Sequence, residues 1–88
     1  MGNAWGFIET RGLAASLEVT DRMLKCAPVM IKMKTSGDSA LTTIIIEGET
    51  AAVQMAITEG IKQAKMKENI VAYTVMHRPV LEETGLLK

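Results

Sequence analysis

The order of apolar and polar residues along this 88-residue chain predicts four strands and two helices. Short apolar or alternating segments are typical of strands, whereas apolar residues repeated every three or four positions indicate a helix with one buried face. The strands are predicted at Ala4–Glu9, Val29–Lys34, Leu41–Glu47 and Ile70–Met76, and the helices at Leu13–Ala27 and from Ala51 to about Lys67. The polar run Thr35–Ala40 lies between the two middle strands and is predicted to be a hairpin turn.

The first predicted helix has an apolar stripe at helical spacing, formed by Leu13, Leu17 and Leu24, with Val19 and Met23 beside it. This stripe is predicted to be the buried face. Thr10 is predicted to cap the helix, because a Thr hydroxyl accepts a hydrogen bond from a free amide of the first turn.

The second predicted helix buries a stripe of Val53, Ile57, Ile61 and Ala64. Gly60 lies inside this helix, where glycine costs roughly 1 kcal/mol relative to alanine. A close approach of another backbone at Gly60 is the expected reason for the glycine. The third strand, Leu41–Glu47, is β-branched through most of its length and is predicted to be well buried.

The order strand, helix, strand, strand, helix, strand is that of ferredoxin-like α+β folds, in which one four-stranded antiparallel sheet carries both helices on one face. The chain is expected to be one domain over residues 4–80. A tail follows at 81–88, and the end of the chain is predicted to include a short C-terminal helix. The other face of the sheet is left bare, which favours self-association, although a solvated face is the ordinary alternative.

Composition narrows the classes of partner. Ten basic and ten acidic residues cancel, so no net field attracts nucleic acid or an anionic membrane. RNA-recognition domains share this element order but stack bases on aromatic residues of the central strands, and Leu41–Glu47 contains none. No apolar run approaches the roughly 20 residues of a membrane span. A single cysteine, Cys26, excludes an internal disulfide and is typical of a reducing cytosol.

Candidate catalytic and metal-binding residues are few. Cys26 and the only histidine, His77, have no third partner at a spacing that nucleophilic catalysis or a metal site needs. Cys26 is therefore interpreted as a small packed residue and His77 as a surface residue at the end of a strand. Catalytic residues, metal ligands and cofactors are not predicted.

One run of residues carries a family resemblance. Gly6–Leu13 resembles the opening of bacterial microcompartment shell proteins of the single-domain, hexamer-forming type. Asp21–Ala27 is similar to the end of that family's first helix, and Thr42–Glu49 to its strand and acidic entry to the second helix. Gly60 falls on a helical glycine of the family, and Met76–Pro79 resembles its closing Arg-Pro. The register holds from Gly6 to Pro79 without a gap.

The resemblance implies a structural protein that has no catalytic activity. It also implies that the protein lies in the cytoplasm, in the shell of a bacterial microcompartment. Family members form flat cyclic hexamers that tile into the facets of a shell around enzymes and pass small polar metabolites through a central pore. The implied partners are further copies of this chain, other shell proteins and the encapsulated enzymes. Lys25 and Arg78 match family residues that make contacts between neighbouring hexamers.

The resemblance assigns the pore to the central loop, through Ser36, Gly37, Asp38 and Ser39. The family's usual run is Lys-Ile-Gly-Ser-Gly, and this chain has Ser36-Gly37-Asp38-Ser39-Ala40 instead. The family lysine is replaced by Ser36, which removes a ring of cations. Six Asp38 carboxylates facing the axis would disfavour anions and raise one another's pKa.

Two other functions remain open at this point. A small ferredoxin-like domain that senses a metabolite bound between subunits is the main alternative, and it would form a dimer, trimer or tetramer with saturable ligand binding. An enzyme has the least support, because the sequence offers no constellation of acid, base and nucleophile.

Overall fold

The computed structural model describes residues 4–36, 41–77 and 85, with residues 33–36 described by their backbone. The elements appear in the predicted order. They are β1 (Ala4–Arg11), α1 (Leu13–Cys26), β2 (Met30–Ser36), β3 (Leu41–Gly48), α2 (Thr50–Gln63), the 3₁₀ helix η1 (Lys67–Asn69) and β4 (Ile70–His77).

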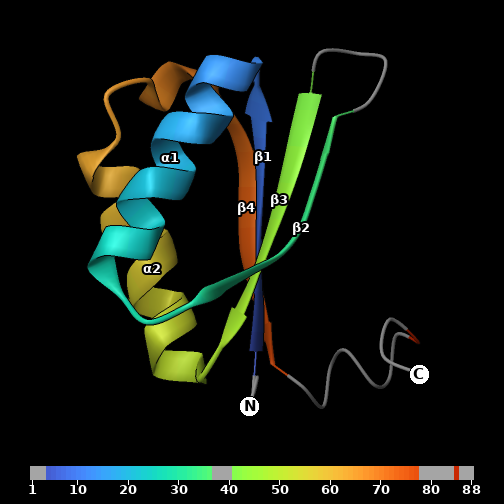
Figure 1. Cartoon of the computed structure of the whole chain (residues 1–88), viewed down its shortest axis with the longest axis vertical. Coiled ribbons are helices and arrows are strands. Elements are labelled where there is room, and N and C mark those ends of the chain that lie inside the picture. Colours follow the sequence, from blue (N-terminus) through green and yellow to red (C-terminus); the bar gives the residue numbers. More distant parts are fainter. Residues whose placement is uncertain (1–3, 37–40, 78–84, 86–88) are drawn as a thin grey trace.

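The strands form one antiparallel sheet in the order β2-β3-β1-β4. Both helices lie on the same side of this sheet, and the described chain leaves the other side uncovered (Figure 1). The predicted ferredoxin-like sheet with two helices on one face is therefore confirmed. The short C-terminal helix was predicted for residues outside the described part of the chain.

Burial alternates along the central strands because only one face of the sheet is covered. In β1 the helix-facing residues are Ala4, Gly6, Ile8 and Thr10, all buried, and the residues between them are more exposed. The prediction that the third strand is well buried was wrong, since β3 shows the same alternation. Its inward residues Ile44 and Ile46 belong to the core, whereas Ile45 is half-buried on the bare face.

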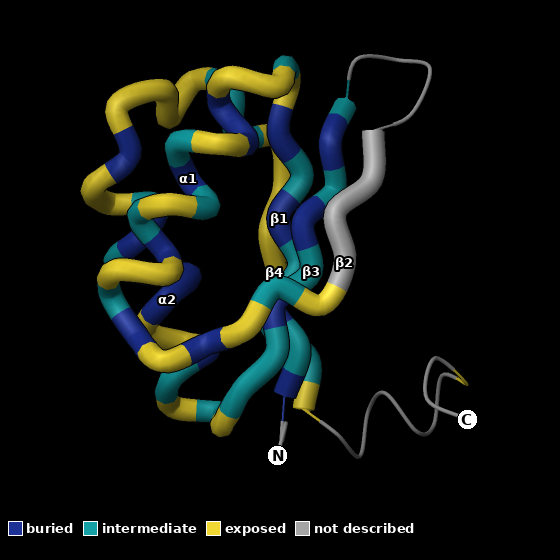
Figure 2. Tube along the Cα trace, viewed as in Figure 1, coloured by how far each residue is buried: buried dark blue, intermediate teal, exposed yellow. Residues whose placement is uncertain are grey.

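The core lies between the sheet and the two helices (Figure 2). α1 contributes Val19 and Met23, and α2 contributes Val53, Ala56 and Ile57. The predicted packing face of α1 was wrong for its three leucines, whereas Val19 and Met23 are buried as predicted. Leu13, Leu17 and Leu24 are 58%, 53% and 45% exposed, and the buried residues of α1 are Ala15, Ser16, Val19 and Met23. Small residues face inward on α1 because two helices and the sheet approach each other closely there.

The predicted cap of α1 was also wrong. Thr10 belongs to β1, faces the helices and is fully buried, and its Oγ1 has no hydrogen-bond partner. β1 continues to Arg11, so the turn into α1 is made by Gly12, which has a φ of 90°. This left-handed conformation is accessible to glycine at little cost, and it replaces a side-chain cap.

The second helix ends four residues before the predicted Lys67, at Gln63. The backbone amides of Lys65 and Met66 donate to the carboxylate of Glu18 in α1, at 2.7 and 3.1 Å. These amides are therefore not available for a continuing α-helix, and the chain turns through η1 into β4.

Candidate assembly surfaces

An apolar stripe runs along the exposed side of α1. Leu13, Leu17 and Leu24 are separated by four and seven positions, so they lie on one side of the helix. Each is about half exposed, as given above, although leucine is among the residues most often buried. We call these three residues the leucine stripe. An exposed apolar stripe of this kind is typical of a surface that binds another protein.

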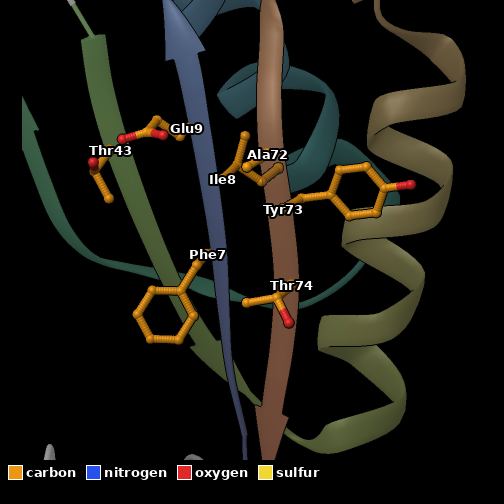
Figure 3. Close-up of a pocket in the computed structure, with 7 residues that line it drawn as sticks. All are labelled: Phe7, Ile8, Glu9, Thr43, Ala72, Tyr73 and Thr74. Carbon is orange, nitrogen blue, oxygen red and sulfur yellow. The ribbon is translucent and has the colours of Figure 1, made fainter.

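The bare face of the sheet has a hollow of about 310 Å³. We call it the sheet hollow. Its lining residues come from the three strands β1, β3 and β4 and are Phe7, Ile8, Glu9, Thr43, Ala72, Tyr73 and Thr74. Figure 3 shows Phe7, Glu9 and Thr43 on one side of β1 and Tyr73 on the other. The wall is mainly apolar, and Glu9 is the only carboxylate among the lining residues, so the hollow is suited to an apolar side chain.

The sheet hollow is bordered by a cluster that already covers part of the bare face. The Nζ of Lys32 lies 4.9 Å from the ring centroid of Trp5 and 3.9 Å from the Oε1 of Glu47. The Trp5 and Phe7 rings lie 6.1 Å apart in a tilted arrangement. Lys32 contacts both Trp5 and Glu47, so these three side chains cover their part of the bare face. The sheet hollow, which begins at Phe7, is not covered by this cluster.

Lys25, the predicted edge residue, lies in the last turn of α1 and points into solvent. Its side chain is 71% exposed and forms an ion pair of 3.1 Å with Asp21, one turn earlier. An exposed pair of this kind contributes little to stability, so Lys25 is available for contacts with another molecule. The other predicted edge residue, Arg78, lies outside the described residues.

The predicted pore residues Gly37, Asp38 and Ser39 lie outside the described residues, and Ser36 is the last residue of β2. Ser36 is paired with Thr42 of β3 in an antiparallel ladder. The chain therefore reverses direction between these two strands, which confirms the hairpin connection.

Glu18 is a structural residue that the sequence analysis did not identify. Its carboxylate accepts two hydrogen bonds from the backbone amides of Lys65 and Met66 and one, at 3.5 Å, from the Nε of Arg22. The bond from the Lys65 amide is the main cause that lowers the pKa of Glu18 below its ordinary value of 4.5. Glu18 thereby fixes α1 to the segment that leads into β4. Its i,i+4 spacing to Arg22 is visible in the sequence, but its partners 47 and 48 positions away are not.

The two residues considered for catalysis, His77 and Cys26, lie in different elements of the fold. His77 is exposed at the end of β4, and its Nδ1 lies 3.5 Å from the Oγ1 of Thr50. Cys26 is half-buried and free. Among the described residues there is no cluster of three or more potential metal ligands, and none of the described helices is long and apolar enough to cross a membrane.

The described chain is a small α+β domain with one covered and one uncovered sheet face and with exposed apolar residues on both sides. The chain belongs to the BMC domain family, whose model matches residues 4–79. It is 37% identical over 76 residues to the bacterial microcompartment shell protein PduA of Citrobacter freundii, covering 86% of this chain and 82% of that protein. It is 35% identical over 80 residues to the carboxysome shell protein CsoS1 of Prochlorococcus marinus, covering 90% and 78%.

A solved structure has the same fold. It is a microcompartment protein from Desulfitobacterium hafniense, with a TM-score of 0.75 and 25% sequence identity. The alignment covers 97% of this chain and 48% of that one, so the chain spans about half the length of that protein.

Proposed function

We propose that this chain is a structural shell protein of a bacterial microcompartment, that it has no catalytic activity, and that it works as a cyclic homohexamer. The support for the shell role is membership of the BMC domain family together with relatives named as microcompartment and carboxysome shell proteins. As a shell component it lies in the cytoplasm, at the surface of the compartment.

One observation carries the proposal of a ring. The leucine stripe belongs to the helical layer and the sheet hollow to the opposite side of the sheet (Figure 1). A two-fold dimer cannot bury both surfaces, because they face away from each other. A head-to-tail contact buries the stripe of one copy in the hollow of the next, and it closes into a ring when the rotation per copy allows it.

Lateral tiling of these rings uses Lys25 and Arg78. Lys25 is an exposed cation at the end of α1, and its only described partner is Asp21 on the same helix. The basis for assigning both residues to the contact between hexamers is their match to the family's edge residues.

The pore is formed by six copies of the loop through Ser36, Gly37, Asp38 and Ser39. Its position between β2 and β3, and its polar composition, support passage of small polar metabolites. Other shell proteins and the enzymes inside the compartment are the further partners.

Native mass spectrometry and electron microscopy test this proposal together. The wild-type chain is expected to give a six-chain species and, at high concentration, hexagonal sheets. The variant Leu17→Glu places a charge on the leucine stripe and is expected to remain folded but monomeric. Met55→Glu is the matched control, because Met55 is 52% exposed on α2 and lies outside both surfaces. A wild-type chain that stays monomeric at high concentration would contradict the proposal.

A further inference from the structure

A polar residue, Thr20, lies within the leucine stripe. Together with the three leucines it completes a regular spacing of four, three and four positions along α1, so it lies on the same side of the helix. Thr20 is half-buried, and its Oγ1 is buried without a hydrogen-bond partner among the described residues. A rotation about χ1 exchanges Oγ1 with the methyl group, and threonine populates two such rotamers in helices. The hydroxyl can therefore turn outward to a partner that covers the stripe.

The sheet hollow contains one carboxylate, that of Glu9, which is half-buried. The ion pairs of the described residues involve the carboxylates of Glu18, Asp21 and Glu47, and Glu9 takes part in none of them. No hydrogen bond between described side chains or amides engages Glu9 either. Covering the hollow with leucine side chains removes water from this carboxylate, which destabilises the contact unless a hydrogen-bond donor replaces the water. The ring contact therefore needs a donor for Glu9.

The symmetry of a ring determines which residues meet across the contact. A rotation about the ring axis leaves the distance of every atom from that axis unchanged. Residues that meet across the contact therefore lie at similar distances from the axis in their own copies. In the proposed hexamer the loop between β2 and β3 lies at the axis. Arg11 marks that end of β1, because it pairs with Leu41, the first residue of β3 after the loop.

Thr20 and the sheet hollow lie at similar distances from this end of the chain. α1 begins beside the end of β1 and runs back along the sheet (Figure 1). Thr20 is seven residues beyond Leu13, or about 10 Å along the helix at 1.5 Å per residue. Glu9 and Phe7 are two and four residues before Arg11, or about 7 and 14 Å along the strand. Thr20 is therefore placed between the positions of the two hollow residues, within reach of the Glu9 side chain.

We propose that the hydroxyl of Thr20 in one copy donates a hydrogen bond to the carboxylate of Glu9 in the next copy, and that this pair sets the register of the ring contact. The inference rests on the proposed hexamer. A hydrogen bond to a charged acceptor is stronger than one between neutral groups. Any other register places the Glu9 carboxylate against leucine, in the way that a misaligned polar residue in a coiled-coil seam opposes an apolar one. Thr20 and Glu9 thus determine which seating of the stripe in the hollow is stable.

A double-mutant cycle tests the pair in the assembled ring. Thr20→Val removes the hydroxyl and keeps the shape of the side chain, and Glu9→Met removes the carboxylate. Native mass spectrometry of a dilution series gives the chain concentration at which half of the chains are in six-chain rings. Thr20→Val is expected to raise this concentration at least about tenfold, because the carboxylate loses its donor at every contact. In the Glu9→Met background the same change is expected to have less than about a twofold effect.

Thr20→Ser is the conservative control, because it keeps the hydroxyl, and it is expected to stay much closer to the wild type than Thr20→Val. Circular dichroism of each variant verifies that the fold is unchanged. Thr20→Ala, which also lacks the hydroxyl, repeats the cycle if valine disturbs the packing of α1.

The same measurements separate the pair from the hexamer. Thr20→Val may not act equally in the two backgrounds if the pair exists, so equal effects, or no effect in either background, overturn the pair while the hexamer stands. Glu9 is then satisfied by another group, such as Arg11 of its own chain. A wild type that gives no six-chain species overturns the proposed hexamer and the pair together.

Discussion

Gly60 of α2 packs directly on Met23 of α1. A β-carbon on Gly60 would lie 2.6 Å from the Cγ of Met23 and 3.3 Å from both its Cα and its backbone nitrogen. The two helices are therefore separated by a distance that only glycine allows. Met23 is fully buried at this contact.

Gly60→Ala is expected to lower the free energy of unfolding by about 1–2 kcal/mol, because the clash includes the backbone of Met23 and cannot be relieved by a side-chain rotation alone. The intrinsic helix propensity of alanine acts in the opposite direction by roughly 1 kcal/mol and is included in this net value. Urea denaturation at fixed protein concentration measures the change. Thr58→Ala, at an exposed position of the same helix, is the matched control and is expected to be neutral or slightly stabilising. A stabilised Gly60→Ala variant would show that the helices separate at little cost.

Thr10→Val is expected to stabilise the protein by about 1 kcal/mol. The hydroxyl of Thr10 is buried without a hydrogen-bond partner, and valine has nearly the same shape without the polar atom. Strand propensity is similar for the two residues, so the change isolates the hydroxyl. The measurement is the midpoint of thermal unfolding. A lower midpoint would mean that a bound water or another group satisfies the Thr10 hydroxyl.

The carboxylate of Glu18 is expected to make stability depend on pH in the acid range. Because folding lowers the pKa of Glu18, its contribution is fully present above the unfolded pKa, near 4.5, and is lost as the pH falls through the lower folded value. Glu18→Gln is expected to cost about 1 kcal/mol at pH 7, since the charged acceptor of two backbone amides is lost. The difference in stability between wild type and variant should then shrink as the pH falls below the unfolded value near 4.5. Glu59→Gln on α2 is the control for the removal of a carboxylate that accepts neither of these two backbone hydrogen bonds. A difference between wild type and Glu18→Gln that stays constant at all pH values would argue against the role of the charge.

Lys25→Ala is expected to abolish hexagonal sheets while leaving the hexamer and its stability unchanged to within about 0.5 kcal/mol. The ion pair with Asp21 that the variant loses is exposed at both ends and contributes little. Electron microscopy of the variant at high concentration, with native mass spectrometry of the same sample, measures both properties. Lys62→Ala, which removes an exposed lysine from the last turn of α2, is the control. Sheets that form as readily as in the wild type would remove Lys25 from the contact between hexamers.

In the proposed hexamer six Asp38 carboxylates surround the pore and repel anions, so Asp38→Ala is expected to increase the passage of anions. Asp38→Asn is the closer control for size and should give the same direction of change. Conductance of single hexamers in a planar bilayer, compared between a small anion and a small cation, measures the selectivity. Equal anion conductance in wild type and both variants would mean that Asp38 does not face the pore.

The elements of the fold were predictable because they depend on local pattern. Alternation and helical spacing are properties of neighbours in the chain, and they located four strands and two helices within a few residues. The close approach at Gly60 was predictable for a similar reason, since a glycine inside a helix needs a packing explanation. The match of Gly6–Pro79 to the shell-protein family was likewise present in the residues themselves.

Which face of each element is buried was not always predictable. Leu13, Leu17 and Leu24 have the spacing of a packing face, yet they are exposed because α1 packs on α2 and the sheet through its other side, which carries Ala15, Ser16, Val19 and Met23. Apolar spacing indicates a surface that avoids water, and it does not distinguish burial within one chain from burial between chains. Likewise, the length of α2 was set by Glu18, whose partners are distant in sequence.

The sequence by itself determined the element order, the antiparallel hairpin about Thr35–Ala40 and the family, because each depends on the identity and spacing of residues along the chain. The tertiary structure decided which residues remain at the surface. It placed the leucine stripe and the sheet hollow on opposite sides of the sheet, and it placed β4 at an edge of the sheet. These features depend on contacts between segments that are far apart in sequence. Such contacts determine which face of each helix and strand is buried and which face is exposed to solvent.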